Sequence, residues 1–163
     1  MFSGMNIRIG MGYDVHRLVA GRPCIIGGVN FEHDKGLLGH SDADVLLHAI
    51  CDALLGALAL GDIGKLFPDT DPQYAGAASK KLLKECFLRV KEKGFVIGNL
   101  DTVVVCEKPK LQDKRAEMSR VIAAILETSV DNVSIKATTE EKLGFTGREE
   151  GIAAWAYVLL TEA

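Results

Sequence analysis

The sequence lacks the features that mark disordered, secreted or membrane-spanning chains. Four of its 163 residues are prolines, and it contains no low-complexity segment. No apolar run approaches the roughly 20 residues that cross a bilayer, and Met1 to Gly10 lacks a charged segment followed by an apolar one. We therefore expect a cytoplasmic protein of one domain, residues 1–163, with no membrane partner. Residues 1–4 form a short flexible extension in this interpretation.

The chain also lacks a strong excess of positive charge. Its formal net charge is −3, whereas binding to a phosphate backbone usually requires a basic stripe. The lysines and arginine between residues 80 and 93 fit the solvated face of one helix. We therefore expect no nucleic-acid partner.

The four cysteines lack the short spacing of zinc ribbons and redox sites. Cys24, Cys51, Cys86 and Cys106 lie far apart in the chain, and two of them fall in apolar helical stretches. We expect all four to be reduced thiols in the core.

Hydrophobic periodicity predicts strands and three helices. Ile7, Ile9, Met11 and Tyr13 alternate with smaller or polar residues, as in a strand with one buried face. Residues 24–31 read as a hairpin around a Gly-Gly pair, and further strands are expected at 98–105, 132–137 and 151–160. Helices are expected from a cap near Ser41 to about residue 60, at 79–93 and at 113–126.

This order of elements predicts an α+β fold with a single mixed β-sheet and helices packed on one face. The last strand, residues 152–160, is apolar on both alternating faces, as in a strand buried on both sides. Neighbouring subunits could then cover the other face of the sheet.

A metal site is the first chemical feature that the sequence suggests. Asp14 and His16 are two residues apart in an extended segment, so their side chains point to the same side. Asp44, His48 and Asp52 form a polar stripe along an otherwise apolar helix, and a cation would explain buried charge there. Asp14, His16 and His48 therefore predict a site of the zinc type with an open position, with iron as the alternative. Asp44 could simply cap the helix, and Asp52 could orient a ligand histidine.

Two loops carry polar groups suited to phosphate. His40 and Ser41 precede the first helix, where free amides can bind anions, although Ser41 could act only as a cap. The segment 136–148 follows a strand with hydroxyls, two carboxylates, glycines and an arginine, which suits phosphate and a hard cation. The acidic loop at 62–71, taken alone, reads as a turn.

Five blocks in order closely resemble the 2-C-methyl-D-erythritol 2,4-cyclodiphosphate synthase family. They are residues 12–16 (GYDVH), 26–29 (IGGV), 36–44 (GLLGHSDAD), 60–71 (LGDIGKLFPDTD) and 136–151, and together they span nearly the whole chain. The resemblance implies a homotrimer with active sites between subunits. It also implies zinc (Zn²⁺) at Asp14, His16 and His48, and magnesium or manganese (Mg²⁺ or Mn²⁺) at Glu141 with substrate phosphates.

The resemblance further implies the residues that contact the substrate. His40 and Thr139 match positions credited with transition-state stabilisation. Glu140 stands where the family commonly has a threonine or asparagine, so two adjacent acids could meet the second metal, and register favours Glu141. The segment 106–112 varies, and backbone contacts to the nucleotide are expected there. The implied substrate-binding residues are Asp14, His16, His40, Ser41, Asp62, Ile63, Gly64, Phe67, Pro68, Asp69, Thr70, Asp71, Cys106, Pro109, Lys110, Leu111, Thr138, Thr139, Glu140, Glu141, Phe145 and Arg148.

The implied reaction belongs to non-mevalonate isoprenoid precursor synthesis. The 2-phosphate of 4-diphosphocytidyl-2-C-methyl-D-erythritol 2-phosphate attacks the β-phosphorus, which closes a cyclic diphosphate and releases CMP. Two alternatives use the same residues: a metal-dependent phosphohydrolase, and a non-catalytic trimeric module that binds a phosphate ligand.

Overall fold

The computed structural model describes residues 4–163 and contains one main sheet of five strands. These are β1 (Ile7–Ala20), β4 (Lys35–Leu38), β5 (Phe95–Val105), β6 (Val133–Thr138) and β7 (Gly151–Glu162). Their order across the sheet is β4-β1-β7-β5-β6, and the β5–β6 pair is parallel whereas the other pairs are antiparallel. The mixed sheet is therefore confirmed. Most of the predicted extension at residues 1–4 lies outside the described residues, which begin at Gly4.

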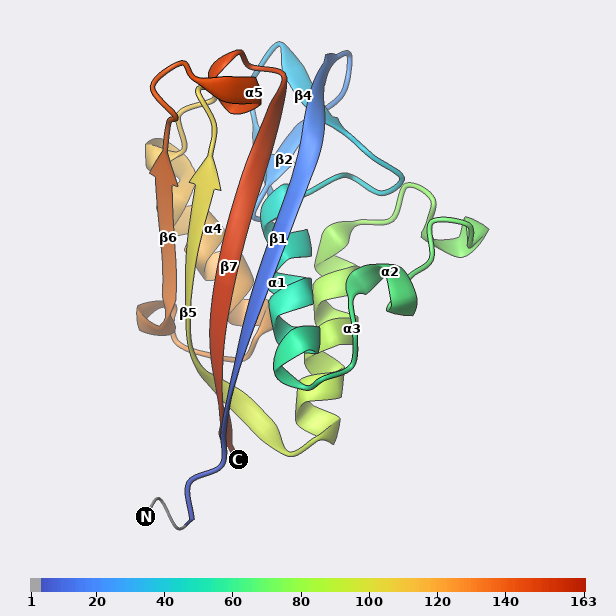
Figure 1. Cartoon of the computed structure of the whole chain (residues 1–163), viewed down its shortest axis with the longest axis vertical. Coiled ribbons are helices and arrows are strands. Elements are labelled where there is room, and N and C mark those ends of the chain that lie inside the picture. The colour runs from blue at the N-terminus through green and yellow to red at the C-terminus, as the bar shows by residue number, and fades with distance from the viewer. Residues whose placement is uncertain (1–3) are drawn as a thin grey trace.

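Three long helices lie on one side of this sheet, as the sequence predicts (Figure 1). They are α1 (Val45–Ala57), which packs against β1 and β7, α3 (Ser79–Glu92) and α4 (Arg115–Ile125). Gly94, which follows α3, has a φ of +81°, as expected of a residue that ends a helix. The short elements are α2 (Ile63–Leu66), α5 (Gly144–Gly147) and the 3₁₀ turns η1 (Pro72–Tyr74), η2 (Gln112–Lys114) and η3 (Val130–Asn132).

The predicted hairpin is present as β2 (Cys24–Ile26) and β3 (Val29–Phe31). Gly27 and Gly28 form its turn with φ of +61° and +75°, a region that favours glycine. The buried carboxylate of Asp44 binds both turn amides, at 2.9 Å from Gly27 N and 2.7 Å from Gly28 N. One side chain therefore fixes the hairpin against the start of α1.

The predicted boundaries of the first helix were wrong at both ends. Asp44 is the N-cap and accepts from Leu47 N at 3.0 Å, so α1 begins at Val45. The hydroxyl of Ser41 instead accepts from Ala43 N in the preceding turn. The helix ends at Ala57 because Ala59 adopts a φ of +55°, which no α-helix contains. An anionic cap also makes this helix start less attractive to a phosphate than the sequence suggested.

The covered face of β1 is made of small residues. A Cβ atom on Gly10 would lie 1.9 Å from the carbonyl oxygen of Ala53, and one on Gly12 would lie 1.9 Å from that of Ala49. The glycines therefore allow the backbone of α1 to approach the strand directly. Asp14 and His16 continue the same face of β1 beyond the glycines, toward the N-terminal end of α1.

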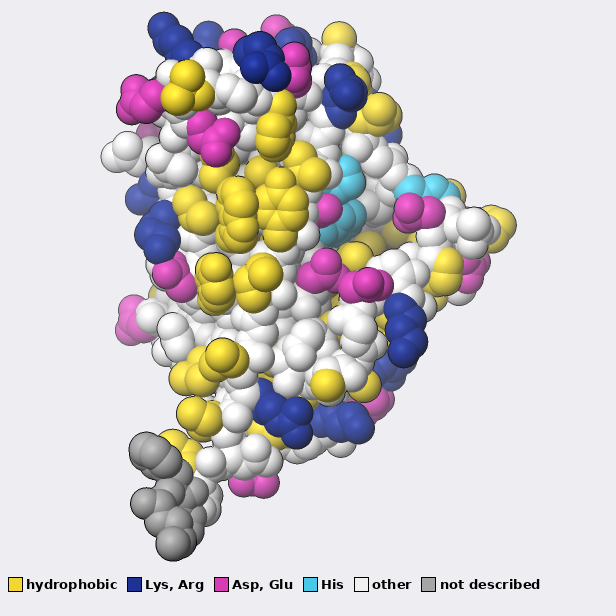
Figure 2. Space-filling model, viewed as in Figure 1, with side chains coloured by type: hydrophobic (Ala, Val, Ile, Leu, Met, Phe, Trp, Pro, Cys, Tyr) yellow, Lys and Arg dark blue, Asp and Glu magenta, His cyan; other side chains and the backbone are white. Residues whose placement is uncertain are grey.

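The opposite face of β1 carries the large apolar side chains. Figure 2 shows a hydrophobic patch over the strands, beside the histidines. We call the following residues the open face: Ile7, Ile9, Met11, Tyr13 and Val15, which are exposed, with Trp155, Tyr157 and Leu159 from β7. The alternating apolar residues of β1, which were expected to form a buried face, are therefore not covered by the chain's own helices, because α1 packs on the glycine side.

All four cysteines are buried free thiols, as expected. Burial is the main reason that the pKa rises to about 11 for Cys24 and to about 12 for Cys106. Among residues 4–163, no helix is long and apolar enough to cross a membrane.

Candidate metal centre and substrate pockets

Three ligand atoms of the predicted triad converge on one point. Asp14 Oδ2 lies 2.8 Å from His16 Nε2 and 3.3 Å from His48 Nδ1, and the two nitrogens are 3.3 Å apart. Strand β1 supplies the first two residues and helix α1 the third. All three side chains are partly buried.

The hydrogen bonds of the outer ring nitrogens show which nitrogens face this point without a proton. His16 Nδ1 lies 2.9 Å from the carbonyl oxygen of Leu38, which can only accept, so Nδ1 carries the proton. His48 Nε2 lies 2.8 Å from Ser79 Oγ, which leaves Nδ1 as the inner nitrogen. Two nitrogen lone pairs and a carboxylate oxygen therefore meet at one place.

The convergence also perturbs the titration of the ligands. Burial alone would raise the pKa of Asp14, but the adjacent imidazoles of His16 and His48 outweigh it and lower the pKa. Burial alone would lower the pKa of His16, and Asp14 outweighs it in the opposite direction. Each shift favours the charged form of the side chain, as expected where opposite charges are held close together.

The donor set fits a divalent metal ion. Among the described residues, the buried Asp14 Oδ2 has no hydrogen-bond donor. Zinc with bonds of about 2.0–2.1 Å in tetrahedral geometry would hold neighbouring ligand atoms about 3.3 Å apart, which matches two of the three separations found here. The three residues could therefore hold such an ion together.

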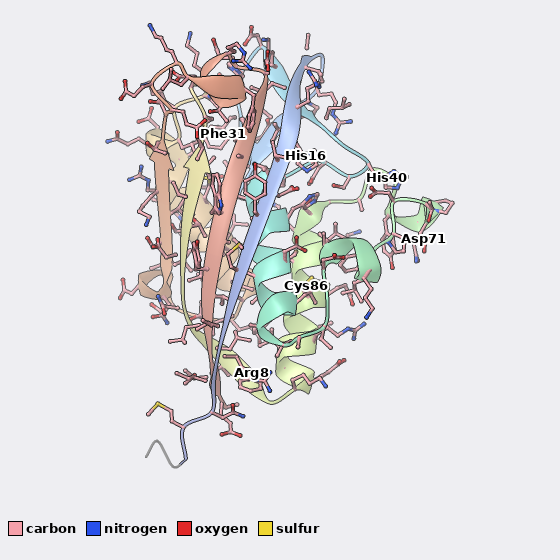
Figure 3. All side chains as sticks on the ribbon, viewed as in Figure 1. Arg8, His16, Phe31, His40, Asp71 and Cys86 are labelled. Atoms are coloured by element: carbon pink, nitrogen blue, oxygen red, sulfur yellow. The ribbon has the colours of Figure 1, made fainter. Side chains whose placement is uncertain are left out.

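A pocket of about 260 Å³ surrounds the triad. Figure 3 shows His16 on β1, His40 on the loop after β4 and Asp71 beyond α2 along the same side of the molecule. We call this cavity the metal pocket. The predicted residues that line it are Asp14, His16, His40, Ser41, His48, Ile63, Gly64, Phe67 and Asp69.

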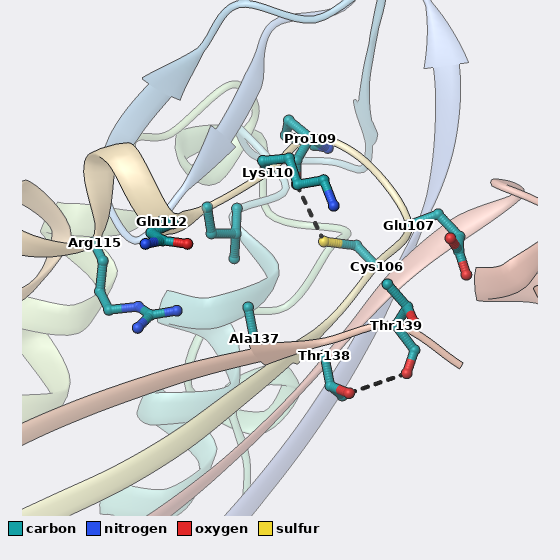
Figure 4. Close-up of a pocket in the computed structure, with 10 residues that line it drawn as sticks. Cys106, Glu107, Pro109, Lys110, Gln112, Arg115, Ala137, Thr138 and Thr139 are labelled. Carbon is teal, nitrogen blue, oxygen red and sulfur yellow. Dashed lines mark hydrogen bonds between the residues drawn. The ribbon is translucent and has the colours of Figure 1, made fainter. Parts of the chain in front are cut away.

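A second pocket of about 200 Å³ lies between the ends of β5 and β6 and the start of α4 (Figure 4). We call it the strand-end pocket. The thiol of Cys106 donates to the carbonyl oxygen of Pro109 at 3.6 Å, which closes the turn at one side of it. The predicted residues that line it are Cys106, Pro109, Lys110, Leu111, Thr138 and Thr139.

The two pockets share no lining residue, so one chain does not bring all the predicted site residues together. Several carboxylates among the rest have local partners. Asp62 caps α2 through Lys65 N at 2.9 Å, and Asp71 caps η1 through Gln73 N at 3.1 Å. The predicted residues that line neither pocket are Asp62, Pro68, Thr70, Asp71, Glu140, Glu141, Phe145 and Arg148.

The two adjacent acids differ in their surroundings. The carboxylate of Glu140 accepts from the buried Thr146 hydroxyl at 2.5 Å. Glu141 is exposed with a φ of +55°, and its amide donates to Thr139 Oγ1 at 3.3 Å. Among the described residues, the Glu141 carboxylate has no hydrogen-bond or ion-pair partner. It is the acid that remains available to a cation.

Asp52 does not orient a ligand histidine. Its carboxylate accepts from Ile63 N at 2.7 Å and so anchors the start of α2 against α1. Its pKa is raised, chiefly by burial. Asp52 therefore acts on the segment that lines the metal pocket.

The sequence analysis missed several residues that line the pockets. Tyr74 and Leu82 line the metal pocket, and Arg115 lines the strand-end pocket. Glu107 and Gln112 also line the strand-end pocket, and they belong to the segment 106–112, where contacts to the nucleotide were expected through the backbone. The three-residue spacing between Gln112 in η2 and Arg115 at the start of α4 is the one signal that could have added Arg115 to that segment.

The fold and the triad together define a small α+β protein with a metal site beside a cavity. Residues 7–161 match the model of the YgbB family. A Bacillus cereus protein named 2-C-methyl-D-erythritol 2,4-cyclodiphosphate synthase is 59% identical over 153 residues, which cover 94% of this chain and 97% of that protein. The chain belongs to the YgbB family.

Solved structures agree with this assignment. The bifunctional IspDF of Campylobacter jejuni is similar with a TM-score of 0.94 and 44% identity over 98% of this chain, which spans 43% of that protein. A CDP complex of IspF from Plasmodium falciparum is similar with a TM-score of 0.86 and 34% identity, covering 96% of this chain and 97% of that chain. The chain is accordingly a lyase of isoprenoid biosynthesis of the cyclodiphosphate synthase type.

Proposed function

We propose that the chain converts 4-diphosphocytidyl-2-C-methyl-D-erythritol 2-phosphate into 2-C-methyl-D-erythritol 2,4-cyclodiphosphate and CMP. The observation that carries the proposal is the convergence of Asp14, His16 and His48 beside one pocket. The CDP complex of a similar protein supports a cytidine nucleotide as part of the ligand. An oxygen of the 2-phosphate attacks the β-phosphorus, and the bond from that phosphorus to the CMP oxygen breaks.

Asp14, His16 and His48 hold zinc in this proposal, and Glu141 holds magnesium or manganese together with substrate phosphates. The metal ions supply positive charge that polarises the phosphate groups of the substrate. The uncommitted carboxylate of Glu141, beside the engaged Glu140, supports its assignment.

The residues of the chain position the two phosphates. His40 and Thr139 stabilise the charge that develops during transfer, and Ile63 and Gly64 line the metal pocket. Asp52 holds that backbone in place through Ile63 N. An intramolecular attack gains most of its rate from such positioning, so the reaction requires no covalent enzyme intermediate.

A homotrimer with active sites between subunits completes the proposal. The strand-end pocket receives the cytidine part of the substrate, and the metal pocket of a neighbouring chain receives the reacting phosphates. The exposed apolar open face and the separation of the two pockets support this arrangement.

Phosphorus NMR of the purified protein with the cytidine diphosphate substrate tests the reaction. A cyclic diphosphate and CMP should form, and a chelator should stop their formation until zinc and magnesium are restored. Inorganic phosphate as the product would instead indicate a phosphohydrolase.

His48→Ala separates catalysis from structural bracing. We expect it to lower activity at least about 1000-fold, since the metal site loses a ligand. The trimer and the melting temperature should stay near those of the unaltered protein. A variant that unfolds or dissociates on losing zinc would favour a non-catalytic module in which the metal only supports the fold.

A further inference from the structure

A chain of hydrogen bonds leads from the metal site into the protein. His48 Nε2, on the side of the ring away from Asp14, lies 2.8 Å from the hydroxyl of Ser79. That hydroxyl contacts Asp42 Oδ1, and Asp42 Oδ2 lies 3.0 Å from Ser79 N. Ser79 is completely buried, so its hydroxyl depends on partners within the protein for its hydrogen bonds.

The direction of these hydrogen bonds follows from what each group can donate. An ionised carboxylate only accepts, so the single hydroxyl proton of Ser79 is donated to Asp42. The Ser79 oxygen must then accept from His48, which places the proton of the imidazole on Nε2. Ser41 Oγ, 3.2 Å from the same nitrogen, accepts from Ala43 N, and within residues 4–163 it makes no such contact with a carboxylate.

The same carboxylate connects two loops around the metal pocket. Ala78, the N-cap residue of α3, makes no capping hydrogen bond through its side chain, and Asp42 binds the amide of Ser79 in its place. Asp42 N also donates to the carbonyl oxygen of Ala77, at 3.1 Å, and Asp42 Oδ1 accepts from Asp44 N at 3.1 Å. The position of the Ser79 hydroxyl is therefore fixed from several directions.

We infer that Ser79 and Asp42 are positioning residues that hold His48 in the tautomer and orientation in which Nδ1 binds the metal. The inference rests on the metal site of the proposed function and adds two residues that lie outside the triad. Ser79 transmits the negative charge of Asp42 to the imidazole, which makes Nδ1 a stronger ligand. Outer partners of metal-binding histidines commonly change metal affinity by about 10- to 100-fold.

Zinc affinity of the metal-free protein, measured by competition with a chromophoric chelator, tests the inference without using activity. Ser79→Ala removes the acceptor, and Asp42→Asn weakens it by removing the charge. We expect each variant to bind zinc about 10- to 100-fold more weakly than the unaltered protein. The double variant should bind no more weakly than the weaker single variant, because the two residues act in series.

Two further variants separate this role from a general loss of packing. Ser79→Thr keeps the hydroxyl and should recover most of the zinc affinity. Thr102→Val removes another buried hydroxyl, in β5 and away from the site. This hydroxyl donates to the carbonyl oxygen of Ser134 in β6 at 2.9 Å. It should lower the melting temperature and leave zinc affinity unchanged.

The outcomes are distinguishable. If Ser79→Ala and Asp42→Asn bind zinc within twofold of the unaltered protein, Asp42 serves only as a remote cap for α3 and the inference is wrong. If the unaltered protein itself binds no zinc through His48, the metal site of the proposed function fails and the inference fails with it. Weakened zinc binding without any cyclodiphosphate product would sustain the inference and refute the proposed reaction.

Discussion

The two faces of β1 differ in their side chains and in what covers them. On the covered face, Gly10 and Gly12 lie against the backbone of α1, and the following positions on that face are the ligands Asp14 and His16. On the open face, large apolar side chains alternate with them and stay exposed, with Ile9 at 78%. One strand therefore places a helix and a metal site on one side and an unoccupied apolar surface on the other.

This difference explains why the larger side chains do not face the core of the chain. A helix can lie directly on a strand only where side chains are absent, and the close approach brings His48 of α1 within reach of Asp14 and His16. Apolar side chains on the open face pair across strands, such as Tyr13 with Trp155 at 4.6 Å between ring centroids. Exposed apolar patches of this kind commonly mark interfaces.

The largest effect is expected on the covered face. Gly12→Val would place a branched side chain where the Ala49 carbonyl already lies, and should lower the free energy of unfolding by at least about 3 kcal/mol. Urea denaturation measures this loss. Gly56→Ala on α1 is the matched control, because its nearest neighbour would be Met11 O at 3.8 Å, and it should be neutral or stabilising by up to about 1 kcal/mol. A harmless Gly12→Val would contradict the close approach.

A substitution on the open face is expected to disrupt the assembly of subunits and to leave the fold of the single chain intact. Ile9→Glu introduces charge into the apolar patch, so the proposed trimer should dissociate, and activity should fall more than about tenfold as the proposed shared sites are lost. Sedimentation velocity measures the assembly, and zinc affinity should remain unchanged. Val130→Glu, at an apolar residue of η3 that is 47% exposed, should leave the assembly intact. An unaltered oligomer in Ile9→Glu would refute the proposed interface.

A carboxylate on the covered side should matter for stability and for its pH dependence. Asp44→Ala leaves the amides of Gly27, Gly28 and Leu47 without their acceptor and should cost about 2–3 kcal/mol. Burial raises the pKa of Asp44 from 3.8 to about 6, so the folded state holds the proton more tightly than the unfolded state.

The stability that Asp44 contributes is then fully present below about pH 4 and declines as the pH rises through about 6. The cost of Asp44→Ala should therefore be larger at pH 4 than at pH 7, as thermal unfolding of both proteins can show. Asp71→Ala, which removes an exposed cap, should cost at most about 1 kcal/mol. An equal cost at both pH values would argue that the pKa of Asp44 is not raised.

The smallest effect is expected from an ion pair on the open side of the sheet. Lys136 Nζ lies 2.7 Å from Asp101 Oδ2, and both side chains are substantially exposed. The pair lowers the pKa of Asp101, but solvent screens such interactions, so Lys136→Met should change stability by less than about 1 kcal/mol. Urea denaturation at low and high salt provides the measurement. If Lys136→Met lowered the free energy of unfolding as much as Asp44→Ala does, the two sides of the sheet would not differ in how much their polar contacts stabilise the fold.

Much of the fold could be predicted because its signals are local. The Gly-Gly turn, the helix at 79–92 with its glycine stop, and the strands other than β4 follow from periodicity and turn chemistry. The elements that were missed, β4, α2 and α5, are each four residues long, too short to show a period. The true cap of α1 was misplaced because Ser41 and Asp44 are both good caps and only the backbone course distinguishes them.

The candidate site divides in the same way. Asp14 and His16 could be paired from the sequence alone, because residues two apart in a strand share a face. Asp42 and Ser79 could not be connected, since 37 residues separate them and each is an ordinary polar residue at a helix start. Neither could the division of the predicted residues between two pockets, which depends on where β5 and β6 end relative to α1.

The sequence by itself determined the pattern of alternation, the family and the identity of the three ligands. The tertiary structure alone decided which face of β1 is covered, which nitrogen of His48 faces the metal point, and which side chains support it. The physical reason is that alternation along a strand defines two faces but does not decide which of them a helix will cover. Only a helix lying close enough to touch the backbone makes one of them the interior.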